Sequence, residues 1–375
     1  MKAQLQLATV MMAAGLAAVA QSPRLYRSGN EWIQEVSGTF SAGTVVKVKS
    51  SAGSIRVQGA QQTNITYTIR EHVRAGSAEA ARRELGRMKF TTYSSGETVV
   101  LQADCEGSNQ GSIDFAVQVP MQATLVRMET LGGTVTATNL SGKVAARTGG
   151  GAIRLDQISG VISVSSAGGN IEIGKAGSDV QAWTGGGNIG LVSAAGRVEA
   201  NSAGGNLNIG WAKVMKLQTG AGSIHVNKCD GEVRAETGGG NVELNEIAGP
   251  VQIESAGGSI HFGPIKGGVR AETAAGGIIA RLAPGGAFTD SRLETNVGDI
   301  VVYVPEGLGV TIRATAEAAR GYGIRSDYRE LKITSPQRGL GPREAYAEGS
   351  LNGGGPVLHV HTTAGNIEFK REASR

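Results

Sequence analysis

Residues 231–248 read GEVRAETGGGNVELNEIA, and this stretch decides the fold. It contains two short runs in which apolar and polar residues alternate, Val233-x-Ala235 and Val242-x-Leu244, separated by three glycines. Alternation with a period of two predicts short β-strands with one side facing inward and the other facing solvent. The stretch therefore predicts two strands joined by a tight turn.

The same pattern recurs along the chain every 18 residues, with a single interval of 17 between Gly205 and Gly222. A hydroxyl residue stands three positions before most of these corner glycines, and an aliphatic residue follows two positions after each. One such unit cannot bury its few apolar side chains alone, but stacked copies can. The sequence predicts an all-β fold, a β-solenoid of 18-residue coils with two short strands per coil. The corner glycines are Gly133, Gly151, Gly169, Gly187, Gly205, Gly222, Gly240, Gly258 and Gly276.

The small residues at the corners have expected roles. We expect the corner glycines to adopt positive φ, and the Ser or Thr hydroxyls to cap amides of the turn. Asparagines directly follow four of the glycines, and Asn tolerates the left-handed region and can form a ladder of stacked side-chain amides. They are Asn170, Asn188, Asn206 and Asn241.

Two segments interrupt the repeat and suggest the domain limits. Residues 21–125 are expected to form an N-terminal capping region, a small α/β insertion with strands over 65–69, 98–102 and 113–119 and a helix over 77–88. The solenoid core is expected over 126–304, followed by a loop excursion over 305–356. Residues 357–375 then return as strands that close the solenoid. Both interruptions are expected to cap the stack, because exposed end strands invite aggregation.

Composition excludes several classes of protein. The chain has 375 residues with 58 Gly and only 9 Pro, and the glycines do not recur every third residue, which excludes a collagen helix. A net charge of +4 and well-spread Val and Ile argue against intrinsic disorder. Lys and Arg are scattered along the chain, so a nucleic-acid partner is not expected.

The first 20 residues predict a secretory signal peptide. Lys2 precedes an apolar stretch from Leu5 to Ala20, which ends in the A-x-A sequence 18–20. We expect cleavage near Ala20 and export to the periplasm, the cell surface or the medium, with no transmembrane segment in the mature chain. Export permits a disulfide between Cys105 and Cys229, but two unrelated, partly buried thiols are the favoured interpretation.

Solvent-facing residues of successive coils should form columns. Three residues after the corner glycines come His225, Glu243 and His261, a conceivable zinc-type site to which His359 and His361 would add ligands only if their strand folds nearby. A straight column matches a tetrahedron poorly, so we favour an exposed ladder without a metal.

A second column, four residues before the glycines, contains Glu236, Glu254 and Glu272. Like charges one strand apart repel, and Arg234 and Arg270 can compensate the outer two glutamates. A salt-bridge ladder is the favoured interpretation, and a calcium or cationic-ligand patch is the alternative.

Two aromatic residues are further candidates. Trp183 lies in the glutamate column and Trp211 at a coil corner, where either side chain could stack on a sugar ring or cover a hydrophobic turn. We favour the covering role.

No catalytic motif is present in the sequence. The glycine-rich turns recur in every coil and lack a following helix, so they do not predict a dinucleotide site, and we expect neither cofactor nor metal. Glycoside cleavage would need two carboxyl groups across a cleft, and no such pair can be assigned. We therefore expect a protein that is not an enzyme.

The repeat, together with the exported start and the Val119-Pro120 step, resembles the DUF4097 family of bacterial β-strand repeat proteins, over about residues 38–370. The resemblance implies an exported protein with an adhesin label and supplies no catalytic motif. The leading hypothesis is a secreted or cell-surface protein that binds a glycan, an envelope component or another protein. A self-associating structural protein of the cell envelope is the alternative, and a carbohydrate-active solenoid enzyme is the third.

Overall fold

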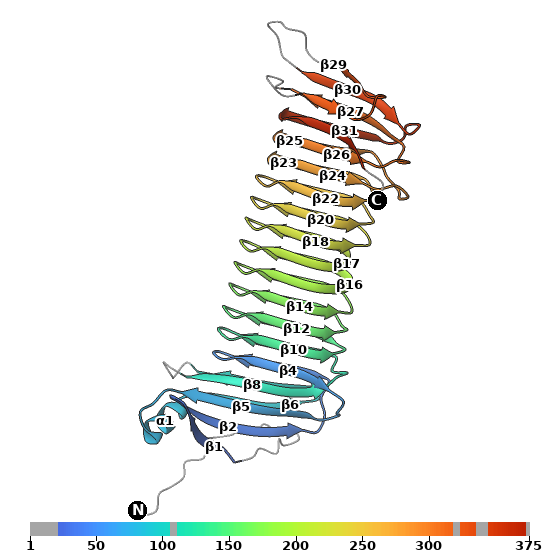
Figure 1. Ribbon diagram of the computed structural model, residues 1–375. Helices are drawn as coiled ribbons and strands as arrows, with labels where there is room; N and C mark the ends of the chain where they lie inside the picture. The colour runs from blue at the N-terminus through green and yellow to red at the C-terminus, as the bar shows by residue number, and fades with distance from the viewer. Residues whose placement is uncertain (1–21, 106–110, 318–322, 335–343, 373–375) are drawn as a thin grey trace, which may run out of the picture. The chain divides into compact units, whose positions relative to one another are not determined.

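Stacked β-strands dominate the protein, as seen in a computed structural model that describes residues 22–105, 111–317, 323–334 and 344–372 (Figure 1). The predicted signal peptide lies outside the described residues. The chain divides into two units, Met1–Gly185 and Gly186–Arg375. Among the described residues, no helix has the length and apolar character needed to cross a membrane.

Each coil contributes one strand to each of two parallel ladders. β11 (Lys143–Thr148) pairs with β13 (Ile162–Ser166), and β12 (Ile153–Ile158) pairs with β14 (Ile171–Ala176). The strand register follows the 18-residue period of the sequence, because Val144 lies opposite Ile162 and Ile153 lies opposite Ile171. Inward-facing aliphatic side chains therefore form continuous buried rows. The predicted β-solenoid is confirmed.

The first unit joins parallel coils to an N-terminal cap, defined as residues 24–40 and 65–120, whose outer strands are antiparallel. One ladder runs β6 (Lys89–Ser95), β7 (Thr98–Asp104), β3 (Val45–Ser50), β9 (Leu125–Thr130), β11, β13 and β15 (Val180–Thr184). The other runs β1 (Arg24–Ser28), β2 (Glu31–Phe40), β5 (Ile65–Val73), β8 (Ser112–Pro120), β4 (Ile55–Ala60), β10 (Val135–Leu140), β12 and β14.

The helix expected in the cap is α1, Ala78–Leu85. Ser77 caps it, because the Ser77 hydroxyl accepts a hydrogen bond from the amide of Ala80 at 3.2 Å. The sequence pattern did not predict β1, β2 or β6, although β1 pairs with β2 and β6 pairs with β7 as antiparallel neighbours in the chain.

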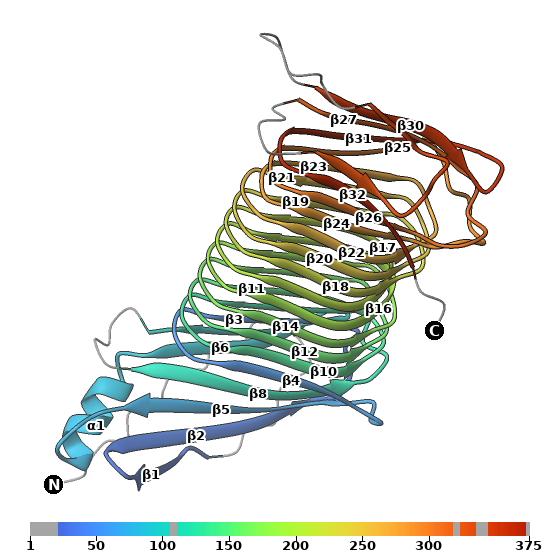
Figure 2. The same cartoon turned by 45° about the horizontal axis from the view of Figure 1, so that its top comes forward.

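The second unit is itself built of such coils, and its turns join two ladders (Figure 2). Two long strands, β16 (Ile189–Ser202) and β17 (Leu207–Thr219), each serve both ladders. One ladder continues through β19 (Val233–Thr237), β21 (Val251–Ser255), β23 (Val269–Ala275) and β25 (Ser291–Val297). The other continues through β18 (Ile224–Cys229), β20 (Val242–Ile247), β22 (Ile260–Ile265), β24 (Ile278–Leu282) and β26 (Ile300–Val304).

The segment 305–356 differs from the expected loop excursion. Its described part forms β27 (Val310–Ala316), β28 (Ile324–Ser326), β29 (Lys332–Thr334) and β30 (Ala345–Leu351). β31 (Val357–Ala364) inserts between β25 and β27, while β30 and β29 add antiparallel strands beyond β27. β32 (Ile367–Arg371) likewise lies between β26 and β28. The loop prediction was wrong because these strands pair out of chain order and leave no fixed period in the sequence.

Most corner glycines are required for a reason other than the expected one, although Gly276 does have positive φ. Gly133 and Gly151 do not have positive φ, whereas Gly53, Gly276 and Gly298 do. At Gly151 a Cβ would overlap the carbonyl oxygen of Gly133, the corner glycine of the preceding coil. Stacked backbones approach too closely there for any side chain, so steric exclusion selects glycine.

Buried hydroxyls hold the corners together. Thr237 Oγ1 donates to the carbonyl of Gly222 at 2.8 Å and accepts from the amide of Gly240 at 3.2 Å. The expected capping of turn amides is thus confirmed, and the same hydroxyl also bonds to the coil before it. The asparagines act differently from a side-chain ladder, because Asn206 Oδ1 accepts from the backbone amide of Ser223 at 2.8 Å.

The single 17-residue interval has a structural counterpart. The register between β16 and β17 shifts between Ala194 and Arg197, which lie opposite Ala212 and Val214. The shorter coil thus lacks one residue at this corner, and both ladders keep their register on either side of it.

Candidate binding face

The outward side of one ladder in the second unit carries two adjacent columns of polar side chains. Strand alternation turns every second residue outward, and strand pairing aligns two such residues per strand across β17, β19, β21, β23, β25, β31, β27 and β30. We call this surface the two-column face. Its first column is Lys216, Arg234, Gln252, Arg270, Arg292, His359, Arg313 and Glu348. Its second column is Gln218, Glu236, Glu254, Glu272, Glu294, His361, Thr315 and Tyr346.

The three glutamates singled out from the sequence lie on consecutive strands of this face. Glu272 pairs with Arg270 at 2.8 Å, as expected, and Glu254 accepts a hydrogen bond from Gln252 at 2.9 Å. Glu236 is held by Gln218 at 2.7 Å and not by Arg234, because Gln218 lies directly opposite on the neighbouring strand.

Two further members of the second column escaped the sequence analysis. The offset of four residues before a corner glycine also gives Glu294 from Gly298 and His361 from Gly365. The sequence pattern that gave the three glutamates therefore also identifies Glu294 and His361. Arg313 and Tyr346 had no such signal, because the strands that carry them join the ladder out of chain order.

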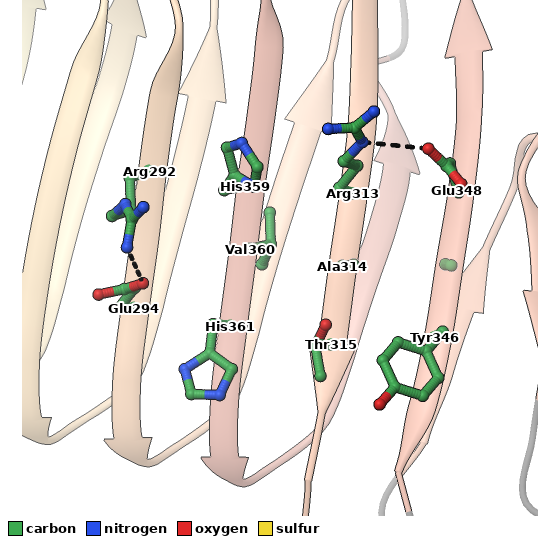
Figure 3. Close-up of a pocket in the computed structure, with 11 residues that line it drawn as sticks. Arg292, Glu294, Arg313, Ala314, Thr315, Tyr346, Glu348, His359, Val360 and His361 are labelled. Atoms are coloured by element: carbon green, nitrogen blue, oxygen red, sulfur yellow. Dashed lines mark hydrogen bonds and ion pairs between the residues drawn. The ribbon is translucent and has the colours of Figure 1, made fainter.

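A hollow of about 440 Å³ lies where β25, β31, β27 and β30 meet (Figure 3). Its floor is formed by the strands at the buried residues Ala314, Ala347 and Val360. Polar side chains and one aromatic ring surround the floor. They are Arg292, Glu294, Arg313, Thr315, Tyr346, Glu348, His359 and His361.

Ion pairs fix the charged side chains of the hollow. Arg292 Nη1 donates to Glu294 Oε1 at 2.8 Å, and Arg313 Nε donates to Glu348 Oε1 at 3.0 Å (Figure 3). His361 Nε2 lies 3.0 Å from Glu317 Oε1. In the part of the chain that the structure describes, the His359 ring has no side-chain partner, although it lies between the two arginine strands.

The histidine column lies on the other ladder. His225, Glu243 and His261 occupy consecutive strands β18, β20 and β22, and His225 Nδ1 is 3.2 Å from Glu243 Oε2. His359 and His361 belong to β31 of the first ladder, so they do not join this column. Within the described ranges, no group of three or more His, Cys, Asp or Glu residues could hold a metal ion.

The two tryptophan candidates lie in different units. Trp183, on β15 of the first unit, is 50% exposed and lies opposite the small residue Ser165. Trp211 lies at the corner of the 17-residue coil, where its indole Nε1 donates to Asp230 Oδ2 at 3.1 Å.

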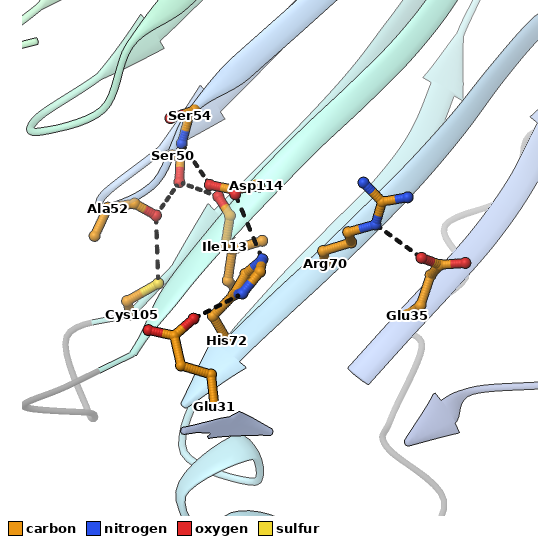
Figure 4. A network of polar contacts seen from close by, with 10 residues as sticks. All are labelled: Glu31, Glu35, Ser50, Ala52, Ser54, Arg70, His72, Cys105, Ile113 and Asp114. Atoms are coloured by element: carbon orange, nitrogen blue, oxygen red, sulfur yellow. Dashed lines mark hydrogen bonds and ion pairs between the residues drawn. The ribbon is translucent and has the colours of Figure 1, made fainter. Parts of the chain in front are cut away.

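A polar cluster lies in the N-terminal cap (Figure 4). His72 Nδ1 is 3.5 Å from Glu31 Oε2, and His72 Nε2 is 3.4 Å from Asp114 Oδ2. The Asp114 carboxylate raises the pKa of His72, with a smaller contribution from Glu31. Burial pulls the pKa of Asp114 upward, but His72 and the amide of Ser54 outweigh it, and this pKa is lowered.

Both cysteines are free and buried. Burial raises the pKa of the Cys105 thiol and that of the Cys229 thiol. A nucleophilic or metal-binding cysteine needs a lowered pKa, so these thiols have the character of core residues.

No family model matches the chain, and no curated protein matches it. The chain is weakly similar to solved structures, including two crystal structures. A putative cell adhesion protein from Clostridium sporogenes ATCC 15579 is 9% identical, with 91% of this chain and 100% of that chain covered and a TM-score of 0.21. A putative adhesin from Bacteroides fragilis NCTC 9343 is 11% identical, with 72% and 96% covered and a TM-score of 0.24. Both neighbours are described as putative adhesion proteins, and at these TM-scores the likeness carries no argument about this chain.

Proposed function

We propose that this chain is an exported β-solenoid binding protein of the adhesin type, and that the two-column face is its contact surface. The observation that carries the proposal is the continuity of the two columns over eight strands. Seven strand spacings of ~4.8 Å give a face about 34 Å long. Donors and acceptors at such a regular spacing suit an extended polar partner, such as a glycan, an envelope component or a protein.

The proposal includes no chemical reaction on the partner. Glycoside cleavage needs two carboxyl groups on opposite sides of the scissile bond. The carboxylates of the second column stand side by side on one sheet, and their nearest partners are Arg and Gln side chains. This arrangement favours binding over cleavage.

A variant that preserves net charge tests the face. R234Q/E236Q/R270Q/E272Q removes two positive and two negative charges, so non-specific attraction by the basic protein stays constant. We expect it to bind envelope fractions and glycan arrays at least about tenfold more weakly than the wild type, a loss of about 1.4 kcal/mol. The matched control is R154Q/E172Q, which removes an exposed ion pair of 2.9 Å in the first unit. Equal binding by all three proteins contradicts the proposal.

Export is tested separately. The protein recovered outside the cytoplasm should begin at Gln21, as measured by intact mass. Retention of residues 1–20 contradicts this part of the proposal.

Self-association is the second candidate, because the two columns are complementary to each other. A twofold rotation about an axis parallel to the columns lays the first, mainly basic column of one copy over the second, mainly acidic column of another. Light scattering with size-exclusion chromatography tests this idea. A dimer that R234Q/E236Q/R270Q/E272Q converts to a monomer supports self-association, and a wild-type monomer at high concentration refutes it.

A further inference from the structure

We infer that the hollow at the β25–β31–β27–β30 end of the two-column face binds a uronic-acid residue of an acidic polysaccharide. Arg292, His359 and Arg313 take its carboxylate, and Tyr346 packs against its ring. The inference rests on the proposed function, because it specifies the ligand class of the same face.

Three cationic or donor-capable groups stand in one row across the hollow. Arg292, His359 and Arg313 lie directly opposite one another on adjacent strands, so the outer two backbones are ~10 Å apart. The other residue of the first column that lies between two arginines is Gln252, and its side chain already bonds to Glu254. This row therefore differs from the rest of the face.

Both guanidinium groups keep N–H donors for a ligand. Arg292 uses Nη1 for Glu294, and Arg313 uses Nε for Glu348, whereas a guanidinium carries five N–H groups. Arg292 and Arg313 side chains are 50% and 56% exposed, so the remaining donors are accessible. A planar guanidinium matches a carboxylate in a bidentate geometry, which favours an acidic over a neutral sugar.

The second column supplies the room and the apolar wall. Thr315 is the short residue between His361 and Tyr346, and its size opens the space above the sheet. The Tyr346 ring, which is 47% exposed, leans from β30 toward Thr315 (Figure 3). An aromatic ring with a polar tip suits a sugar, which has an apolar face and a hydroxyl rim.

The remaining carboxylates fit the hydroxyl groups of a sugar. Glu294 and Glu348 border the hollow and have acceptor lone pairs beyond those used by the arginines. The volume of about 440 Å³ falls in the range of ~300–1,000 Å³ that small-molecule sites occupy. Size, charge and the single aromatic wall thus agree on one saccharide unit with a carboxylate.

Calorimetric titration of the full chain with tetragalacturonate and maltotetraose at low ionic strength tests the inference. We expect tetragalacturonate to bind at least tenfold more tightly than neutral maltotetraose. R292Q and R313Q should each weaken tetragalacturonate about tenfold, and Y346A should weaken it while Y346F does not. The matched control R154Q removes an exposed arginine that forms an ion pair with Glu172 in the first unit, outside the two-column face, and should change affinity less than twofold.

The outcomes separate this inference from the proposed function. Absence of tetragalacturonate binding, equal binding of maltotetraose, or an R154Q effect as large as that of R292Q overturns the inference. If this happens while envelope binding remains sensitive to R234Q/E236Q/R270Q/E272Q, the face still binds and only the ligand class is wrong. If tetragalacturonate does not bind and envelope binding is also insensitive to R234Q/E236Q/R270Q/E272Q, both proposals are overturned.

Discussion

Replacing Glu71 with glutamine should stabilise the N-terminal cap above neutral pH. Glu71 lies in β5 at an inward-facing position between Ile69 and Val73, and only 2% of its surface is exposed. Burial raises its pKa to about 7, and a hydrogen bond of 2.7 Å from Gln34 Nε2 opposes only part of this change.

The sign of the effect follows from proton binding. The folded protein holds the Glu71 proton up to a pH of about 7, whereas the unfolded chain releases it near the ordinary value of 4.5. Stability therefore falls as pH rises between these values and stays low above them. A pKa raised from 4.5 to about 7 corresponds to about 3 kcal/mol of lost stability at pH 8, as an upper figure.

Tryptophan fluorescence gives a local measurement of cap stability. The chain has three Trp, so W183F/W211F leaves only Trp32, whose indole donates to the carbonyl of Ala75 at 3.1 Å within the cap. Urea unfolding of this protein, with and without E71Q, gives the free energy of unfolding of the cap from pH 4.5 to pH 8.5. His72 and Asp114 titrate in both proteins, so the difference between the curves isolates Glu71.

We expect the two proteins to be equally stable near pH 4.5 and E71Q to be more stable by about 2–3 kcal/mol at pH 8. The glutamine keeps an oxygen that accepts from Gln34, so the change removes charge and little else. A difference that does not vary with pH, or a less stable E71Q at pH 8, refutes the reasoning.

Three further predictions concern the coil interior. G240A should destabilise the second unit by about 2 kcal/mol or more, because its Cβ would overlap a backbone carbonyl of the preceding coil, while G239A, which meets nothing within 4 Å, should unfold like the wild type in urea. T237V should lower the free energy of unfolding by about 1–3 kcal/mol in the same assay, because two buried hydrogen bonds are lost, whereas T237S should keep most of this stability. Equal stability of T237V and T237S contradicts the role of the hydroxyl at the corner. Cys105 and Cys229 should resist a thiol reagent in the folded protein and both react after denaturation, and a missing thiol in the denatured chain would reveal a disulfide.

The repeat made most of the fold predictable from sequence. Stacked coils place residues 18 apart opposite each other, so arithmetic on the corner glycines finds both strands and the glutamate column. The role of the glycines was less accessible, since sequence alone does not reveal whether positive φ or close backbone approach selects glycine. Gly133 and Gly151 do not have positive φ, and a Cβ at either position would overlap backbone atoms, so close backbone approach selects glycine there.

The hollow was beyond prediction because its walls come from distant segments. β31 inserts between β25 and β27, so Arg292 and Arg313 flank His359 although they precede it by 67 and 46 residues in the sequence. Only pairing partners reveal this neighbourhood, and partners beyond the period leave no trace in local alternation. Tyr346 is a similar case, because an antiparallel strand brings it in.

The coil that carries the two-column face is also an interchangeable module. In the second unit, β21 contacts β19 on one side and β23 on the other, and equivalent residues recur after 18 positions. An insertion or deletion of one whole period therefore joins matching ends, preserves each buried row and adds or removes one member of each column. The length of the face can change in steps of ~4.8 Å, one strand spacing per coil. The residues that form the hollow at the end of the face would stay the same. The length of the binding face can therefore change while the residues of the hollow that contact a ligand are kept.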